Sequence, residues 1–198
     1  MKLLKVMKHM ENLIEKAKSE FLKMVDDFGS DPYHLLPHVP EAEKWAKRML
    51  KKYPEADEET VLLAIWLHDI GHYPIPTEID HAVRGEQRAM DFLEKEKYPA
   101  DKIEKVLHCV RAHRCRDVMP ASIDAKIIAF SDSASHMTDT MYLDMVRVNE
   151  EGKFPRTYAK IERDYRDLAM FPEMQEELSE LYKSWKVLLK AYENIKLN

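Results

Sequence analysis

Residues 64–72 read Ala-Ile-Trp-Leu-His-Asp-Ile-Gly-His, an apolar segment that runs directly into an adjacent His-Asp pair. Val61, Ala64 and His68 recur at helical spacing, which predicts that His68 points in the same direction as the core residues. Gly71 follows almost at once and is typical of the end of a helix. The segment therefore predicts a buried helix whose end presents an imidazole beside a carboxylate.

A buried imidazole next to a carboxylate is costly unless both groups find partners. A divalent cation binds both directly, and the nitrogen of His68 with the oxygen of Asp69 suits Fe, Mn, Co, Ni or Zn. The alternative is that His68 is a hydrogen-bonded core histidine and Asp69 a residue of the following loop. The pair on its own does not decide between the two interpretations.

The rest of the chain has the period of an α-helix, and no alternating apolar run predicts a strand. Gly and Pro divide the helical segments, and Asp57 and Asp80 are good N-caps for two of them. We expect an all-α fold. The expected helices are 3–28, 40–53, 57–71, 80–95, 99–114, 124–137 (continuing or kinking towards 148), 156–170 and 172–195.

Length and composition narrow the class of protein. The 198 residues suit one domain, and a net charge of −5 argues against a nucleic-acid polymer or an anionic membrane as the partner. Two cysteines make no disulfide framework and indicate a reducing compartment. The amino terminus lacks the features of a signal peptide, and no apolar run is long enough to span a membrane. We expect a cytoplasmic protein.

Two further residues extend the His-Asp pair into a pattern. His38 has Ala42 and Ala46 on its helical face, and Asp132 is placed inwards in the segment Lys126–Asp132, KIIAFSD. With the upstream His, the LHDIG context and the downstream Asp, the chain resembles the HD superfamily of metal-dependent phosphohydrolases. The resemblance covers about residues 30–150. It implies an HD-domain helical bundle, with an amphipathic helix at 1–29 packing on it and a helical extension at 151–198.

By that resemblance His38, His68, Asp69 and Asp132 are the ligands of one metal. Many members carry two more histidines that support a second metal or bind phosphate. His81 and His113 occupy the expected places, although both could be ordinary histidines at helix ends. The expected cofactor is therefore one or two divalent transition metal ions.

The chain departs from the family pattern in two respects. His38 is flanked by Pro37 and Pro40, which makes His34 a rival or a neighbouring extra residue of the site. The acidic pair of the (p)ppGpp hydrolases and the Gly-Tyr-Pro block of the cyclic-di-GMP phosphodiesterases are both missing. The sequence therefore disfavours these two specialised activities.

Basic side chains near the pattern suit phosphate oxygens. Arg84, three residues after His81, is the best candidate for phosphate contact, and Arg114 and His72 are further candidates for substrate binding. The segment 147–166 offers a second basic clamp, although most arginines of so charged a chain are solvated surface groups. No role is assigned to His136.

The resemblance implies a metal-dependent phosphohydrolase that acts on a nucleotide or other small phosphate ester through metal-activated water. Asp69 would bind metal and orient or deprotonate the water, with Arg84 as the other catalytic residue. Two alternatives remain open: a di-iron HD-type oxygenase, and a non-catalytic module that binds a metal or a nucleotide. The first helix and the Met-rich segment 137–145 are possible surfaces of a homodimer.

Overall fold

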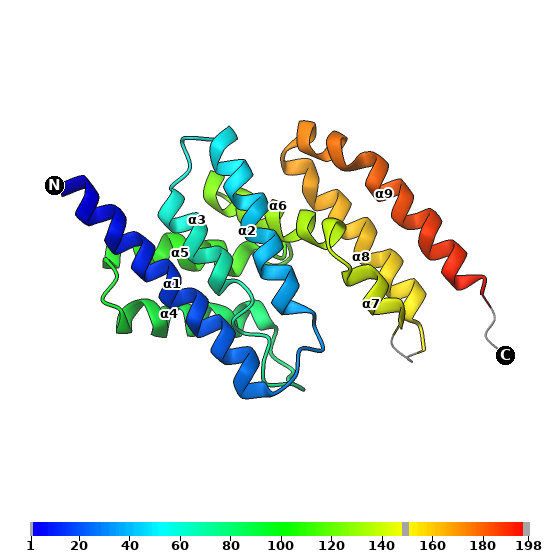
Figure 1. The fold of residues 1–198 in the computed structure, drawn as a ribbon, viewed down its shortest axis with the longest axis horizontal. Coiled ribbons are helices and arrows are strands. Elements are labelled where there is room, and N and C mark those ends of the chain that lie inside the picture. The colour runs from blue at the N-terminus through cyan, green and yellow to red at the C-terminus, as the bar shows by residue number, and fades with distance from the viewer. Residues whose placement is uncertain (1, 148–150, 196–198) are drawn as a thin grey trace.

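The computed structural model describes residues 2–147 and 151–195, and in these residues it is all-α, with no strand (Figure 1). No helix among them is both long and apolar enough to cross a membrane. The helices are α1 (Lys2–Phe28), α2 (Leu35–Lys52), α3 (Glu58–Leu67), α4 (His81–Lys95), α5 (Ala100–Ala112), α6 (Ile123–Thr138), α7 (Met141–Arg147), α8 (Lys153–Asp167), the 3₁₀ helix η1 (Leu168–Met170) and α9 (Pro172–Glu193).

Side-chain caps fix the beginnings of three helices. Asp57 accepts a hydrogen bond from the backbone of Thr60 at the start of α3, and Asp80 accepts one from Ala82 at the start of α4. Ser122 does the same for α6. These bonds satisfy backbone donors that have no partner within the helix. The caps predicted at Asp57 and Asp80 are therefore confirmed.

The start of α2 differs from the expected range 40–53. The helix begins at Leu35, because the carboxylate of Asp31 accepts hydrogen bonds from two backbone amides of its first turn, including that of Leu35 at 2.9 Å. Pro37 lies in this first turn, where a backbone donor is not needed. Pro40 lies inside the helix and costs it one backbone bond. The prolines therefore do not delay the helix, and His38 lies within it.

The region after α6 also differs from the expectation of one helix that continues or kinks towards 148. α6 ends at Thr138, and α7 begins at Met141. Asp139 is extended, and its carboxylate accepts a hydrogen bond from the backbone of Met141 at 2.7 Å, which starts a new helix. Val148 lies outside the described residues.

The last two helices are close to their expected ranges. α8 begins at Lys153, because Gly152 adopts a left-handed conformation and Pro155 fits the first turn. α8 ends at Asp167, and η1 occupies the residues between it and α9.

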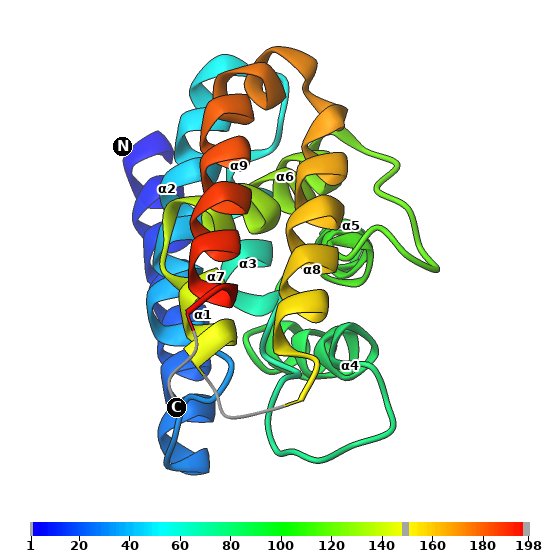
Figure 2. The same ribbon diagram turned by 90° about the vertical axis from the view of Figure 1, so that its right-hand side faces the viewer.

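The buried helix α3 lies at the centre of the bundle. Every residue from Thr60 to Leu67 is buried, and α1, α2, α5 and α6 all pack against this helix. α4 packs on α5, while α8 and α9 lie against α6 on the opposite side of the molecule from α1 (Figures 1 and 2). The carboxyl end of α3, which carries the His-Asp pair, is therefore surrounded by α2, α4, α5 and α6.

Candidate metal centre

Three helices bring the first group of potential ligands together. His38 comes from α2, His68 follows the last residue of α3, and Asp132 comes from α6. The Nε2 atom of His38 lies 3.4 Å from Nε2 of His68 and 3.1 Å from Oδ1 of Asp132. One donor atom of each residue lies within 4.8 Å of the others, close enough to share one metal ion. We call these residues cluster 1.

A second group of three donors lies next to it. Oδ1 of Asp69 is 3.4 Å from Nε2 of His81 and 3.6 Å from Nε2 of His113, and the two imidazole nitrogens are 3.2 Å apart. We call Asp69, His81 and His113 cluster 2. The other oxygen of Asp69, Oδ2, lies 3.4 Å from Nε2 of His68. The carboxylate of Asp69 therefore connects the two clusters.

Backbone carbonyls fix which nitrogen of two imidazoles faces the centre. Nδ1 of His68 lies 2.7 Å from the carbonyl oxygen of Ile65, and Nδ1 of His113 lies 2.6 Å from that of Val110. A carbonyl oxygen only accepts, so each Nδ1 carries a proton. In the neutral form of each ring, which is the form that binds metal, Nε2 is then the nitrogen whose lone pair faces the neighbouring ligands. This arrangement is typical of metal-binding histidines.

A serine gives His38 the same orientation. The hydroxyl of Ser135 donates its proton to the backbone carbonyl of Asp132 at 2.7 Å, and its oxygen lies 2.9 Å from Nδ1 of His38. Because the serine proton is used, Nδ1 of His38 donates, and Nε2 faces cluster 1 as a lone pair. The nitrogen and carboxylate donors of the two clusters thus fit a divalent transition metal.

Burial and mutual charge set the protonation of the centre. His68 and Asp69 are almost fully buried. Burial opposes the ionised form of Asp69, but His68, His72 and His81 beside it hold its pKa well below the usual value. Burial likewise opposes protonation of His68, yet Asp69 and Asp132 raise its pKa to about 9. Burial also opposes the ionised form of Asp132, but His136, His38 and His68 hold its pKa well below the usual value. Asp69 and Asp132 are therefore both ionised at neutral pH.

The histidines of cluster 2 behave differently from His68. Burial lowers the pKa of His81 to about 2 and that of His113 to about 4, and positive neighbours add to the effect, Arg114 and His72 at His81 and His68 at His113. Both imidazoles are therefore neutral at pH 7, which is the form that binds metal.

A close backbone approach places His81 at the centre. A Cβ atom added to Gly71 would lie 2.1 Å from the carbonyl oxygen of His81 and 2.4 Å from the backbone nitrogen of Gly85. The start of α4 therefore rests directly on the turn after the His-Asp pair. A glycine is required at position 71 because no side chain fits between the two segments.

A cavity of about 940 Å³ opens onto the centre. Its walls include Asp69, His81, His113 and Asp132 from the clusters, and also the remaining residues predicted from the sequence to contact substrate. His72 stacks on His81, with ring centroids 3.8 Å apart, and its Nε2 lies 3.3 Å from Oδ1 of Asp69. Arg114 pairs with Asp80 at the cavity wall.

Two of the predicted residues have other contacts. Nδ1 of His34 lies 2.9 Å from a carboxylate oxygen of Asp144, so His34 lines the cavity outside both clusters while His38 lies inside cluster 1. Arg84 lines the cavity, and its two terminal nitrogens donate to the carbonyls of Pro74 and His72 at 3.0 and 3.1 Å. In this conformation Arg84 holds the loop that follows the His-Asp pair.

His136 is a buried neighbour of cluster 1 to which the sequence reasoning assigned no role. Its ring stacks on that of His38 with centroids 4.4 Å apart, and its Nε2 lies 3.6 Å from Oδ1 of Asp132. Its Nδ1 lies 3.1 Å from Nζ of Lys160 and 3.3 Å from a carboxylate oxygen of Asp164. The spacing from Asp132 to His136, four residues on one helix, is the signal that places both on one face.

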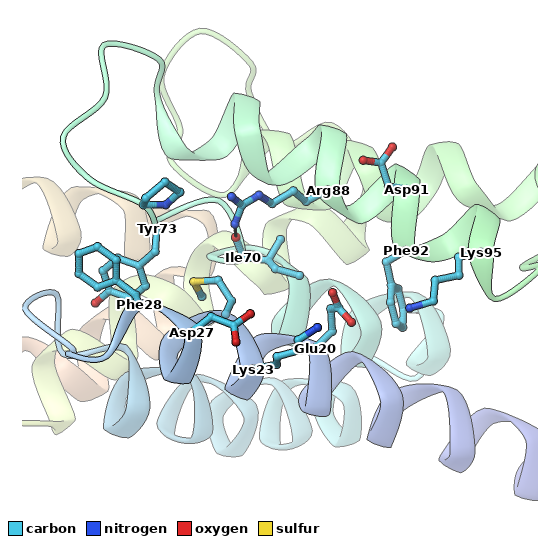
Figure 3. Close-up of a pocket in the computed structure, with 12 residues that line it drawn as sticks. Glu20, Lys23, Asp27, Phe28, Ile70, Tyr73, Arg88, Asp91, Phe92 and Lys95 are labelled. Carbon is cyan, nitrogen blue, oxygen red and sulfur yellow. Dashed lines mark hydrogen bonds between the residues drawn. The ribbon is translucent and has the colours of Figure 1, made fainter.

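A second cavity, of about 420 Å³, lies behind the His-Asp turn, between α1 and α4 (Figure 3). Arg88 reaches across it and donates to the carbonyl oxygen of Ile70 at 2.7 Å. Acidic and basic side chains both line it, and none of the residues of clusters 1 and 2 does. This cavity therefore belongs to the support of the turn and not to the centre itself.

Comparison with known proteins identifies the central region. A model of the HD domain matches residues 36–137, slightly more than half of the chain. No curated protein and no solved structure matches it. The matched region contains every residue of clusters 1 and 2, while α1, α8 and α9 lie outside it.

Proposed function

The chain belongs to the HD domain family, a superfamily of metal-dependent hydrolases, and we propose that it is a metal-dependent phosphohydrolase acting on a nucleotide or other small phosphate ester. The observation that carries the proposal is the pair of three-donor clusters connected by one carboxylate, that of Asp69, at the wall of an open cavity. Two metal ions a few ångströms apart are a recurrent arrangement in enzymes that hydrolyse phosphate esters.

The six residues of the two clusters would hold the ions, with His38, His68 and Asp132 at one and Asp69, His81 and His113 at the other. Fe, Mn, Co, Ni and Zn all accept this set of nitrogen and carboxylate donors. A bound ion of this kind polarises a phosphoryl oxygen and lowers the pKa of a water molecule.

The side chains of the chain itself perform the remaining steps. In hydrolysis a water oxygen bonds to phosphorus, the bond to the leaving oxygen breaks, and a proton must reach that oxygen. Asp69 is ionised and lines the cavity, so we assign it the role of orienting the water and accepting its proton, which then passes to the leaving oxygen. His72, Arg84 and Arg114 line the same cavity and are proposed to contact the substrate.

The test is phosphate release from a panel of nucleotides and small esters, with the protein loaded in turn with Mn, Co, Ni or Fe. We expect activity in the wild type, its loss in Asp69→Asn, and its retention in the matched control Asp101→Asn, an exposed residue of α5. Activity equal in Asp69→Asn and the control would contradict the proposal. Oxygen uptake by an iron-loaded protein without phosphate release would instead support an oxygenase. Metal binding without either reaction would support a binding module.

A further inference from the structure

Helix α8 carries a row of basic side chains on the face that lines the large cavity. Lys153, Arg156, Lys160 and Arg163 are three, four and three residues apart, and all four line the cavity that holds the metal centre. This spacing places them on one helical face. Because α8 lies outside residues 36–137, the row is an addition of this chain to the matched HD domain.

The row passes close to cluster 1. Nζ of Lys160 lies 3.1 Å from Nδ1 of His136, whose Nε2 in turn lies 3.6 Å from Oδ1 of Asp132. The side chain of Lys160 is 16% exposed and is held by Asp164 at 3.2 Å. One ammonium group of the row is therefore separated from a potential metal ligand, Asp132, by a single imidazole ring.

α8 contributes more basic than acidic side chains to the cavity wall. α8 contributes two carboxylates to this wall, Asp164 and Asp167. Asp164 accepts a hydrogen bond from Tyr142 at 2.8 Å and contacts Lys160, while Asp167 is bonded to Arg166. Basic groups therefore outnumber carboxylates on the part of the wall that α8 forms, and such groups favour an anionic part of a ligand.

The row is too long for one phosphate group. Residues 153 to 163 span about 15 Å along the helix axis at the usual rise of an α-helix. One phosphate group contacts only one or two neighbouring side chains of such a row, whereas a chain of phosphates contacts more of them. The cavity of about 940 Å³ also lies at the upper end of the size range of small-molecule sites. Tyr33, Ile79 and Met145 add apolar surface to it for an uncharged part of a ligand.

We propose that α8 binds the further phosphate groups of a substrate that carries a phosphate chain, as a nucleoside triphosphate does, with one phosphate at the metal centre. Arg and Lys form strong charge-assisted bonds with phosphate oxygens, and several on one helix suit several phosphates. As a statement about which substrates are hydrolysed, the inference rests on the proposed phosphohydrolase function. α8 then determines which phosphate compounds the centre accepts.

The test compares two substrates in three proteins. Wild type, Lys153→Gln/Arg156→Gln and the control Lys183→Gln are assayed with ATP and with p-nitrophenyl phosphate, a single ester that needs no second phosphate site. Lys183 is an exposed cation of α9 that does not line the cavity. In the double variant we expect kcat/KM for ATP to fall at least about tenfold, because KM rises. We expect kcat/KM for p-nitrophenyl phosphate to change less than about twofold.

Each other outcome decides the question. Equal losses for both substrates, no loss, the same loss in Lys183→Gln, or a wild type that hydrolyses only the single ester would overturn the inference. If neither substrate is hydrolysed, the proposed activity fails, and calorimetric binding of inorganic tripolyphosphate to the same proteins decides the inference. Binding weakened about tenfold in the double variant alone supports it. Equal binding in all three proteins overturns it.

Discussion

Gly71→Ala tests the link between the backbone and the metal centre. The added Cβ would lie 2.1, 2.4 and 2.9 Å from three backbone atoms of His81 and Gly85, where carbon contacts normally need about 3.5 Å. Backbone atoms cannot rotate away as side chains do, so the first turn of α4 must shift by about 1 Å. Overpacking of this kind costs about 3 kcal/mol.

The shift acts on both stability and the site. For a domain of this size about 3 kcal/mol lowers Tm by about 6–12 °C. His81 is the first residue of α4, so its Nε2 moves away from Oδ1 of Asp69, which it now approaches to 3.4 Å. We therefore expect Gly71→Ala to lose metal at cluster 2 before cluster 1, and to lose about 100-fold in kcat because misplacement by about 1 Å has that effect.

The assay is a manganese titration by calorimetry together with thermal unfolding followed by circular dichroism. Gly29→Ala is the matched control, because Gly29 has a φ of +77° and no atom within 4 Å of an added Cβ. It should cost about 1 kcal/mol through backbone strain and leave metal binding unchanged. If Gly71→Ala matched Gly29→Ala in Tm and wild type in metal affinity, the close approach of α4 would not position His81.

Three further predictions concern other groups. His68→Ala should abolish metal binding at cluster 1 and keep the helical circular dichroism spectrum, since the other helices supply most of the core; loss of the spectrum would make His68 a structural residue. Burial alone would raise the pKa of Asp164, but the neighbouring Lys160 and His136 outweigh this effect and lower it from 3.8 to about 2. The ionised form therefore stabilises the fold above about pH 4, and about 2 kcal/mol is lost as the pH falls from 4 to 2. Urea unfolding of wild type and Asp164→Asn between about pH 4 and 2 measures this loss. If the free energy of unfolding fell equally with pH in both proteins, the prediction would be refuted. Burial raises the pKa of the Cys109 thiol, so iodoacetamide at pH 8 should modify it only after unfolding in urea. Rapid modification of the folded chain would show that this part of the core opens.

Much of the fold could be predicted because local signals decided it. The apolar period placed α1 over nearly its observed range, and the capping carboxylates Asp57 and Asp80 fixed the starts of α3 and α4. The start of α2 could not be read in the same way. Its cap, Asp31, lies four residues before the helix, and prolines suggested a later start.

The potential ligands could be predicted because sequence motifs identified them one by one. The six residues expected as metal ligands all lie in clusters 1 and 2, whereas His34, the possible extra residue, lies outside both. Contacts between distant segments could not be predicted. Lys160 meets His136 across 24 residues, and the terminal nitrogens of Arg84 donate to the backbone carbonyls of Pro74 and His72. Such contacts depend on how helices pack, which no local pattern records.

The most direct test of the account is elemental analysis of the chain purified without chelator or metal-affinity resin. Two clusters of three donors predict close to two equivalents of transition metal per chain, and a smaller metal content in the His68→Ala variant. No bound metal, and none taken up from added Mn, Co, Ni or Fe, would contradict the metal centre on which the proposed function rests.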